Sequence, residues 1–377
     1  CKGLPITSIN MKILHIHTKM TGGGIQAMVA GLTNEMVKNN DVTLLLIYKP
    51  DEKDIFLNKL DKRIKVISLG KTKPGFSIKH IFKIASFVRK NSFDIVHFHG
   101  FFHYHFLSVI LNHTRTKIFY TVHNDADREN TYWEKKMLQL KRYCFQKGWM
   151  MAVTISNTSR KSFVQLYNSP NTLIYNGIGR FSSSSDGDSY ITSLHLGTNT
   201  KILLHPGRIT KQKNQVMLCR AVSSLQKEGL DIILLMAGGQ QDEGIFAELK
   251  GYFEEGRIIY LGERKDIPQL MQHADGLCLS SLWEGLPVVL LESFAAGCIP
   301  ICTPVGGIPD IVQDNFNGIL SESTSEEDYK SALRRWYYLT DDERTEIRTN
   351  VLKSFDRYDI SNCANEYINA YTKALNE

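Results

Sequence analysis

Two glutamates stand alone in an otherwise uncharged stretch of the chain. Glu284 and Glu292 are the only charged residues between Asp275 and Asp310, in the segment "WEGLPVVLLESFAAG". Because charged side chains are rarely buried without a partner, an apolar stretch that keeps two carboxylates suggests that they bind something. A carboxylate can accept hydrogen bonds from both hydroxyls of a vicinal diol such as a ribose. We therefore interpret the two glutamates as hydroxyl-binding groups. The simpler alternative is a solvated loop residue followed by a helix-face glutamate.

The proline between the glutamates predicts a helix that begins at an anion site. Pro287 is expected at the first helical position, where its fixed φ and its missing N–H cost nothing. The N–H groups of Val288 and Val289 would then be available to phosphate oxygens. Glu292 would lie on the second turn of this helix and Glu284 in the preceding loop, so the two carboxylates need not be close.

Two cations follow an apolar run in "KILLHPGRITKQKN". Arg208 can bind a phosphate through two parallel hydrogen bonds, and Lys213 offers a compact point charge. Since "KILLH" predicts a strand, both cations lie at the carboxyl end of a strand, where parallel sheets bind ligands. We expect a diphosphate site here, although two loop cations can also be merely solvated.

A glycine-rich turn, "MTGGGIQAMVAG", follows the predicted strand "KILHI" and precedes a helix. Gly23 and Gly24 would allow an anion to approach the backbone N–H groups of this turn closely. The turn is not a dinucleotide fingerprint, because that pattern requires glycine at the position of Ala27. A simple tight turn is the alternative.

Short aliphatic runs alternate with helical patterns along most of the chain. The predicted strands are "KILHI", "VTLLLI", "DIVHF", "KIFYTV", "MMAVTI", "KILLH", "DIILLMAG", "RIIYLG" and "GLCLS". Continuous apolar strands suit a parallel sheet that is covered on both faces. The pattern occurs twice, on either side of residues 176–200, whose Ser, Gly and Asp content indicates a linker or a long surface loop.

We predict an α/β fold of two doubly wound, Rossmann-like domains. The first is expected over residues 11–180 and the second over residues 181–357. A last helix at residues 358–377 is expected to return to the first domain. Residues 1–10 precede "MKILHIH", which reads like a native start, and are left out of this prediction.

Length and composition indicate the number of domains, the location of the protein and the state of its cysteines. A length of 377 residues fits two domains. No apolar run is long enough for a spanning helix and no signal peptide is evident, so a cytoplasmic protein is expected. Seven cysteines without a C-x-x-C pair indicate free, mostly buried thiols.

Charge is divided unevenly between the two halves. Residues 1–180 carry 27 Lys and Arg against 11 Asp and Glu, a net +16, and residues 181–377 carry 18 against 28, a net −10. The basic half suggests an anionic partner, either a membrane surface, a phosphorylated substrate or a nucleic acid, unless its lysines are only solvated. The basic, aromatic-edged segment "NTYWEKKMLQLKRYCFQKGW" could rest on anionic lipid or be an ordinary surface helix.

Metal binding is not expected. His97, His99, His103 and His105 lie within nine residues of one another, but no companion carboxylate or cysteine spacing supports a metal site. The D-x-D matches at residues 125–127 and 186–188 are too short to carry weight. We expect neither a metal nor a cofactor.

Taken in order, these segments resemble a known family. "EGLPVVLLESFAAGCIP" is similar to the Glu-x7-Glu motif of the retaining glycosyltransferase family 4, whose members have the GT-B fold of two Rossmann-like domains facing a cleft. The supporting segments, in the order of the family, are "DIVHFHG", "TVHN", "LIYNGI", "PGRITKQKN", "LLMAGG" and "TPVGGIPDIV". The resemblance runs from about Met11 to Leu320.

The resemblance implies a role for each candidate residue. Arg208 and Lys213 would bind the diphosphate of a nucleotide-sugar donor, and Glu292 would bind its ribose. Glu284 would contact the transferred sugar. The backbone groups around the sugar and phosphate would come from Gly285, Leu286, Pro287, Val288 and Val289.

The remaining implied roles concern the base, the sugar and the acceptor. Arg264, beside Glu263, would line the nucleobase pocket. His123 would face the sugar, and Gly23 and Gly24 would lie between the donor phosphates and the acceptor.

Three positions depart from the family pattern. Gln26 stands where glutamate is frequent, which weakens an acid–base role there. Gly179 replaces a common aspartate and Asn214 a common glycine, and both changes are expected to affect loops only.

The expected function is retaining transfer of a sugar, most often from a UDP-sugar, to a saccharide or polyprenyl-diphosphate-linked acceptor. The setting would be bacterial surface polysaccharide assembly, with no role for nucleic acid. Double displacement through Glu284 is a possible variant of the mechanism. The alternatives are a sugar-nucleotide epimerase, a phosphorylase and a two-domain binding protein without chemistry. Glycoside hydrolysis is disfavoured, because a loop and a helix turn rather than two facing walls set the spacing of Glu284 and Glu292.

Overall fold

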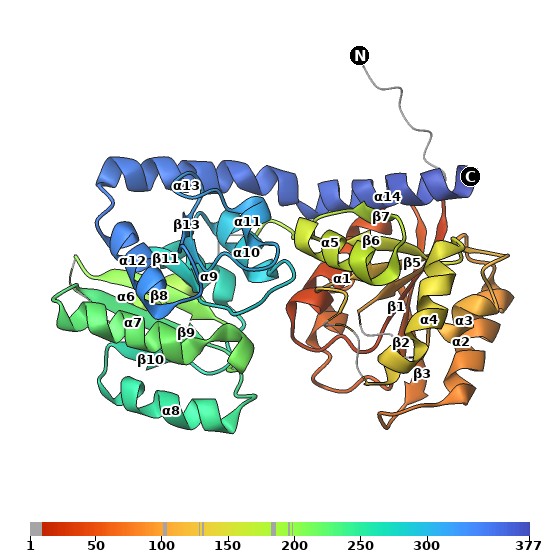
Figure 1. Cartoon of the computed structure of the whole chain (residues 1–377), viewed down its shortest axis with the longest axis horizontal. Coiled ribbons are helices and arrows are strands. Elements are labelled where there is room, and N and C mark those ends of the chain that lie inside the picture. Colours follow the sequence, from red (N-terminus) through yellow and green to blue (C-terminus); the bar gives the residue numbers. More distant parts are fainter. Residues whose placement is uncertain are drawn as a thin grey trace, which may run out of the picture. The chain divides into compact units, whose positions relative to one another are not determined.

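The computed structural model describes residues 10–377 apart from 101–103, 128, 130, 131, 182–185, 195, 196 and 198; the side chains of 132–136 and 186–189 are also outside the description. The chain forms two compact units (Figure 1). The first unit contains the residues up to Gly179 together with Asp359–Glu377, and the second contains Arg180–Tyr358. These divisions lie one residue from the predicted boundaries.

The first unit is built on a seven-stranded sheet in which all pairings are parallel. Its strand order is β3-β2-β1-β4-β5-β6-β7, so the direction of winding reverses between β1 and β4. The strands are β1 (Lys12–His17), β2 (Asp41–Tyr48), β3 (Lys65–Lys71), β4 (Ile95–His99), β5 (Lys117–Val122), β6 (Met151–Thr154) and β7 (Asn171–Leu173).

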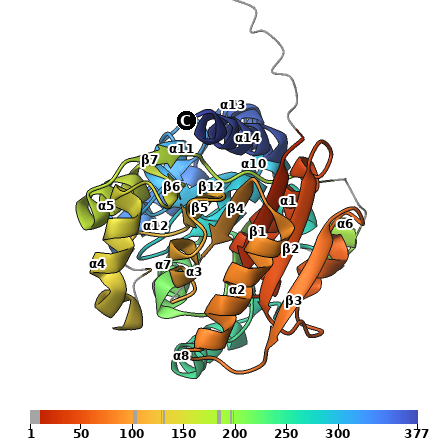
Figure 2. The same ribbon diagram turned by 90° about the vertical axis from the view of Figure 1, so that its right-hand side faces the viewer.

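Helices cover both faces of this sheet, as the continuous apolar strands require. One face carries α1 (Gly24–Met36) and α14 (Ile360–Asn376), which also contact each other. The other face carries α2 (Ile78–Asn91), α3 (Leu107–Ile110), α4 (Tyr132–Gln146) and α5 (Asn157–Tyr167) (Figure 2). The 3-10 helix η1 (Ile55–Lys59) contacts α1.

The last helix belongs to the first unit. The buried residues Cys363, Ala364, Tyr367 and Tyr371 of α14 join the core formed with α1 and the sheet. The N–H of Ile360 donates to the carbonyl of Ile178 at 2.9 Å, which anchors the start of the helix.

The second unit has a six-stranded sheet, also with parallel pairings only. Its order is β10-β9-β8-β11-β12-β13, so winding reverses between β8 and β11. The strands are β8 (Lys201–Pro206), β9 (Ile232–Ala237), β10 (Ile258–Tyr260), β11 (Gly276–Leu279), β12 (Ile299–Cys302) and β13 (Ile319–Leu320).

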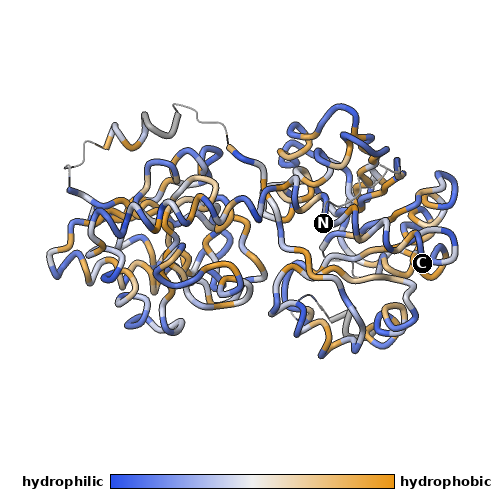
Figure 3. The backbone as a smooth tube through the Cα atoms, turned by 90° about the horizontal axis from the view of Figure 1, so that it is seen from above, coloured by the Kyte–Doolittle hydropathy of each residue, from blue (hydrophilic) through white to orange (hydrophobic). Residues whose placement is uncertain are grey.

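The helices of the second unit connect these strands and complete its carboxyl-terminal part. They are α6 (Asp186–Ser193), η2 (Lys211–Lys213), α7 (Gln215–Lys227), α8 (Glu243–Glu254), α9 (Ile267–His273), α10 (Val288–Ala296), α11 (Ile308–Ile311), α12 (Glu326–Tyr337), α13 (Asp341–Phe355) and η3 (Asp356–Tyr358). In both units, hydrophobic segments run through the interior, and hydrophilic segments lie mainly outside (Figure 3).

The predicted α/β fold of two Rossmann-like units is confirmed, and all nine predicted strands are present. Four further strands were missed. β12 contains Pro300, which normally argues against a central strand. β3 is an edge strand with mostly exposed residues, and β7 and β13 are only three and two residues long.

Residues 176–200 were expected to lack regular structure, but they include α6, which packs on α9. The thiols of the described cysteines are free and buried, as predicted; they belong to Cys144, Cys219, Cys278, Cys298, Cys302 and Cys363. No helix in the described part of the chain is long and apolar enough to cross a bilayer.

Candidate active site

The cations and the first glutamate meet at the switch point of the second sheet. β8 is flanked by β9 on one side and β11 on the other, so the connections after β8 and β11 leave the sheet in different directions. Open parallel sheets bind ligands at the carboxyl edge beside such a point. Arg208 and Lys213 follow β8, and Glu284 follows β11. The three side chains that the sequence separates by up to 76 positions therefore belong to one edge of one sheet.

Glu284 is a buried and fully engaged carboxylate. Its Oε1 lies 2.5 Å from Lys213 Nζ, and the two side chains are 7% and 16% exposed. Ser281 Oγ donates to Oε1 at 2.6 Å, and Gln212 Nε2 approaches Oε2 at 3.3 Å. The interpretation of Glu284 as a solvated loop residue is therefore wrong.

Arg208 differs from Lys213 in having an exposed side chain. Among the residues that the structure describes, its guanidinium forms no hydrogen bond or ion pair. Its backbone is fixed, because the buried amide of Gln215 donates to the Arg208 carbonyl at 2.9 Å and accepts from Thr210 N at 3.4 Å. A rigid loop thus presents a free cation. Gln215 was not predicted, since a lone glutamine at a helix start gives no signal in the sequence.

Asn214 preserves the geometry of this loop. It joins η2 to α7 in the left-handed conformation, with φ 53°. Glycine adopts that conformation most easily, and asparagine is among the few other residues that tolerate it. Asparagine can therefore occupy this left-handed position, where the resemblance led us to expect glycine, with less strain than most other residues.

A second glycine-rich loop supports the glutamate loop from the next strand. Gly307 N donates to the Gly285 carbonyl at 2.6 Å. Gly306 has φ 58°, and a Cβ at this position would lie 1.9 Å from the Glu284 carbonyl oxygen. Only glycine allows this approach, so the segment "TPVGG" fixes the backbone on which Glu284 stands.

The helix after Glu284 begins one residue later than predicted. α10 starts at Val288, and Pro287 is its N-cap rather than its first helical residue. The N-cap carbonyl accepts the first helical hydrogen bond, here from Leu290 N at 3.0 Å. Val288 and Val289 therefore still occupy the first turn, where backbone N–H groups lack helical acceptors and favour anions.

The burial of the other residues in this segment follows from their positions in and before α10. Glu292 is half-buried on the second turn of α10. Gly285, Leu286, Pro287 and Val288 are buried, and Val289 is half-buried. Their contacts with a donor stay a prediction.

Arg264 is held by its own loop. Its guanidinium donates two hydrogen bonds to the carboxylate of Asp266, at 2.8 and 2.5 Å, and these bonds lower the pKa of Asp266. The guanidinium carbon also lies 5.0 Å from the centre of the Tyr190 ring. Its predicted position in a nucleobase pocket remains untested.

In the first unit, the glycine turn lies after β1, beside the switch between β1 and β4. Gly23 is the N-cap of α1 and Gly24 its first residue, and both are exposed. A helix start with exposed backbone N–H groups is a suitable place for an anion.

His123 follows β5 at the same edge of the first sheet, and it is buried. Neither ring nitrogen has a hydrogen-bond partner among the described residues. Burial lowers the pKa of His123 to about 3, so the imidazole is neutral near pH 7. It can exchange hydrogen bonds with a hydroxyl but carries no charge.

Glu129 supports the backbone at His123 and was not predicted. Its Oε1 accepts from His123 N at 2.6 Å and from Asn124 N at 3.1 Å, and Tyr120 Oη donates to Oε2 at 2.8 Å. Burial raises the pKa of Glu129 to about 7. Its position in a polar loop gave no sign that it would be buried.

A buried histidine cluster lies at the β1–β4 switch. His15, His97 and His99 bring ring nitrogens within 4.8 Å of one another and are the described residues best placed to hold a metal. Their nitrogens are largely used in hydrogen bonds, however. His15 Nδ1 and His99 Nε2 lie 2.9 Å apart, and His97 bonds Thr121 Oγ1 at 2.7 Å and the hydroxyl of Tyr371.

This cluster differs from the one that the sequence suggested. His15 comes from another strand, and His103 lies outside the described residues. Burial lowers the pKa of each of the three clustered histidines.

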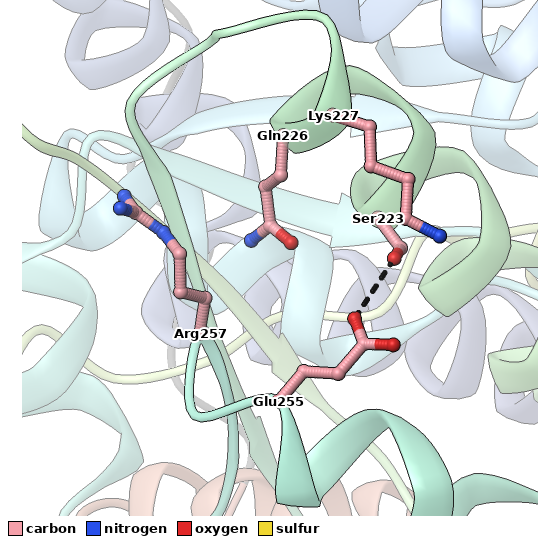
Figure 4. A pocket seen from close by; sticks show the side chains of 5 residues that line it. All are labelled: Ser223, Gln226, Lys227, Glu255 and Arg257. Carbon is pink, nitrogen blue, oxygen red and sulfur yellow. Dashed lines mark hydrogen bonds between the residues drawn. The ribbon is translucent and has the colours of Figure 1, made fainter.

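A shallow depression of about 170 Å³ lies elsewhere on the second unit, near the end of α7 and the start of β10 (Figure 4). It is lined by Ser223, Gln226, Lys227, Glu255 and Arg257. Ser223 Oγ and Glu255 Oε2 are 3.2 Å apart and hydrogen-bonded. Because this is the amino edge of the sheet and holds none of the candidate residues, we assign no ligand to it.

Two doubly wound units with the candidate binding residues at their switch points match the GT-B architecture, and comparison with solved structures agrees. A structure of Anabaena Alr3699/HepE in complex with UDP and glucose superposes with a TM-score of 0.79 at 17% identity, covering 96% of this chain and 100% of that one. WaaG, a glycosyltransferase involved in lipopolysaccharide biosynthesis, gives a TM-score of 0.74 at 16% identity, with 96% and 99% covered.

Sequence comparison identifies the family. The model of glycosyltransferase family 4 matches residues 22–179, and the model of glycosyl transferases group 1 matches residues 188–353. The chain therefore belongs to the family 4 glycosyltransferases, as the Glu-x7-Glu segment indicated.

Two curated relatives match this chain over nearly its whole length. An Escherichia coli protein named UDP-Gal:alpha-D-GlcNAc-diphosphoundecaprenol alpha-1,3-galactosyltransferase is 24% identical, with 97% of this chain and 94% of that protein covered. A Campylobacter jejuni alpha-1,4-N-acetyl-D-galactosaminyltransferase, named for a PP-undecaprenol acceptor, is 23% identical, with 97% and 99% covered.

Proposed function

We propose that this glycosyltransferase moves a sugar, with retention of anomeric configuration, from a UDP-sugar to a saccharide or polyprenyl-diphosphate-linked acceptor in bacterial surface polysaccharide assembly. The observation that carries the proposal is the arrangement at the β8–β11 switch. Two cations, Arg208 and Lys213, lie there with a carboxylate, Glu284, that Lys213 already neutralises. Such a set suits a diphosphate joined to a sugar that carries hydroxyl groups.

The choice of donor and acceptor is supported by the relatives. The E. coli relative is named for UDP-Gal and a diphosphoundecaprenol acceptor, and the C. jejuni relative is named for an acceptor of the same type. The HepE structure contains UDP. The proposed location is the cytoplasm, with peripheral contact at the inner face of the membrane.

In the proposed reaction, the bond between the sugar C1 and the diphosphate oxygen breaks, and the sugar passes through an oxocarbenium-like state. Arg208 and Lys213 offset the charge that develops on the leaving UDP. The acceptor oxygen bonds to C1 on the same face, and its proton moves to the departing phosphate oxygen. This sequence requires no protein nucleophile, and two protein cations occupy the role that a metal would otherwise fill.

The ion pair gives Lys213 and Glu284 a shared role. An ammonium group has three donors, so Lys213 can keep its bond to Glu284 while it binds a phosphate oxygen. Glu284 in turn retains lone pairs on Oε2 for a sugar hydroxyl. We propose that the pair holds the sugar and the phosphate in a fixed relation to each other.

The remaining assignments follow the same chemistry. Glu292 binds the ribose hydroxyls, and the N–H groups of Val288 and Val289 bind a phosphate oxygen. His123, neutral near pH 7, exchanges a hydrogen bond with a sugar hydroxyl. The exposed α1 turn at Gly23 and Gly24 offers N–H groups to an anion.

Three measurements test this function. UDP, and not GDP or ADP, should raise the melting temperature of the chain. NMR of the product made from an α-configured UDP-sugar should show an α linkage, and a β linkage would overturn retention. Full activity should persist in EDTA, and loss of activity that a divalent cation restores would refute the metal-free proposal.

The same assays separate the alternatives. An epimerase would change the sugar of the nucleotide without an acceptor, and a phosphorylase would require inorganic phosphate. A binding protein would show the UDP-dependent shift without turnover of any donor.

A further inference from the structure

Exposed apolar side chains gather on one part of the first unit. Five of the large hydrophobic residues that are exposed in the described chain lie between positions 66 and 82: Val66, Ile67, Phe76, Ile78 and Phe82. Phe76, Ile78 and Phe82 are 58%, 60% and 57% exposed. An apolar group of this kind usually marks a surface that has a partner.

The same region is strongly basic. Between Asp61 and Asp94 the chain has nine Lys and Arg residues and neither Asp nor Glu. On α2, the exposed Lys79 and Lys83 each follow one position after Ile78 and Phe82, so a basic stripe runs beside an apolar stripe. Neither lysine has an acidic partner in the described part of the chain. We call Phe76, Ile78, Lys79, Phe82 and Lys83 the α2 surface.

Contacts within the first unit fix the position of the α2 surface. Lys71 Nζ and Tyr104 Oη, from two different segments, donate to the Gly75 carbonyl at 2.8 and 2.7 Å. The Phe76 ring packs on the Tyr104 ring with centroids 4.6 Å apart. The opposite side of α2 is buried in the core through Ile81, Ile84, Ala85 and Val88. Ile78, Phe82 and the two lysines therefore belong to a fixed helix beside the edge strand β3, and Phe76 lies just before that helix (Figure 2).

We propose that the α2 surface docks the protein on an anionic lipid bilayer. Apolar side chains of such a helix enter the boundary between headgroups and acyl chains, and lysines beside them contact the headgroup phosphates. The absence of acidic residues from this stretch of sequence matches the negative charge of the partner. The proposal rests on the proposed function in one respect only: a lipid-linked acceptor is found at such a bilayer.

The α2 surface replaces the helix that the sequence suggested for lipid contact. Lys141, in α4, is only 1% exposed, and its Nζ lies 4.9 Å from the centre of the Tyr120 ring. Arg142 donates to the Leu166 carbonyl. These two cations of α4 therefore serve packing within the unit. The other two, Lys135 and Lys136, have side chains outside the described set.

Vesicle cosedimentation of the full chain tests the proposal. The probes are vesicles of phosphatidylcholine alone and of phosphatidylcholine with an equal part of phosphatidylglycerol. The protein is expected to bind the anionic vesicles, to bind them less as salt is raised, and to bind the zwitterionic vesicles weakly. Equal binding to both vesicles, or binding to neither, would overturn the proposal.

Paired variants locate the contact. Lys79→Ala with Lys83→Ala is expected to weaken vesicle binding by roughly twenty-five-fold, because each basic residue near an anionic surface contributes about fivefold. Phe76→Ser with Phe82→Ser should weaken it by at least about tenfold. Matched controls in the second unit are Lys353→Ala and Tyr338→Ser, both exposed, which should bind like the unchanged chain. Unchanged binding in both α2 variants would refute the assignment.

Two further readouts separate this inference from the function and from other partners. The α2 variants should keep full transfer to a water-soluble acceptor and lose transfer to a lipid-linked acceptor in vesicles. A chain that binds vesicles but transfers no sugar would keep the docking surface and refute the function. If sedimentation velocity without lipid shows a dimer that Phe76→Ser with Phe82→Ser converts to a monomer, the surface is a self-interface and the lipid proposal is wrong.

Discussion

Removal of the Glu284 carboxylate should destabilise the free protein and change its response to UDP. In the chain without ligand, Glu284 is the counter-charge of Lys213, and both side chains are largely shielded from water. Loss of one partner from a buried ion pair costs about 3–5 kcal/mol, because the other charge is left unpaired. Since Lys213 is 16% exposed and water relieves part of this cost, we expect about 3 kcal/mol for Glu284→Ala.

This free energy should be visible as a lower melting temperature of the second unit. For a domain of this size, about 3 kcal/mol corresponds to about 6–12 °C. UDP should then stabilise Glu284→Ala more than it stabilises the unchanged chain, because its diphosphate supplies the missing negative charge to Lys213. Transfer of the sugar should nevertheless fall, since the proposed hydroxyl contact is gone.

Differential scanning fluorimetry with and without UDP measures both effects. Glu284→Gln keeps hydrogen-bonding groups opposite Ser281 and Gln212 but removes the charge, so it isolates the ionic contribution. Glu327→Ala is the matched control, because Glu327 pairs with Lys330 at an exposed position and should leave the melting temperature nearly unchanged. If Glu284→Ala melts at the same temperature as the unchanged chain, and UDP raises both melting temperatures equally, the pair is neither buried in solution nor part of the diphosphate site.

Three other outcomes are expected. Arg208→Ala should slow transfer by about a hundredfold or more. Its melting temperature should not change, because the Arg208 side chain is exposed and unpaired in the described chain, and a lowered melting temperature would contradict this. Gly306→Ala should destabilise the second unit by at least about 2 kcal/mol, whereas Gly251→Ala, where a Cβ meets nothing within 4 Å, should not. The first unit should lose stability as pH falls below about 6.5, because its buried histidines have lowered pKa values and stay neutral while those of the unfolded chain take up protons. The loss should reach up to about 1.4 kcal/mol per pH unit for each histidine. These histidines are His15, His17, His97, His99 and His123. Melting curves from pH 7.5 to about pH 5 check this. The second unit has one buried histidine with a lowered pKa in its described part, His205, so a first unit no more sensitive to pH than the second would refute the prediction.

Local sequence patterns determined the layers of the fold. Strands buried on both faces must be apolar throughout, and helices that cover them must carry one apolar stripe, so the nine strands predicted from such runs are all present. The rule fails where a strand is not of that kind. β3 lies at a sheet edge and exposes most of its residues, and β12 carries Pro300, so neither shows an uninterrupted apolar run.

Residue chemistry and spacing also identified the polar groups of the second unit. Charged side chains beside buried strands are costly unless they bind a partner, and this reason selected Arg208, Lys213 and Glu284. The structure places all three at one switch point. Which groups contact each other was beyond the sequence. The bond from Lys213 to Glu284 joins positions 71 apart, and only the adjacency of β8 and β11 creates it.

The sequence by itself thus determined that this chain folds into two doubly wound units, because periodicity is a local property, and residue type together with the family resemblance selected the residues that we propose as the nucleotide-sugar site. Tertiary structure decided the state of those residues. It buried Glu284 against Lys213, left Arg208 exposed, placed Glu129 beneath His123 and turned the apolar stripe of Phe76, Ile78 and Phe82 outward. Burial and pairing depend on which distant segments become neighbours, and that is settled only when the sheets assemble.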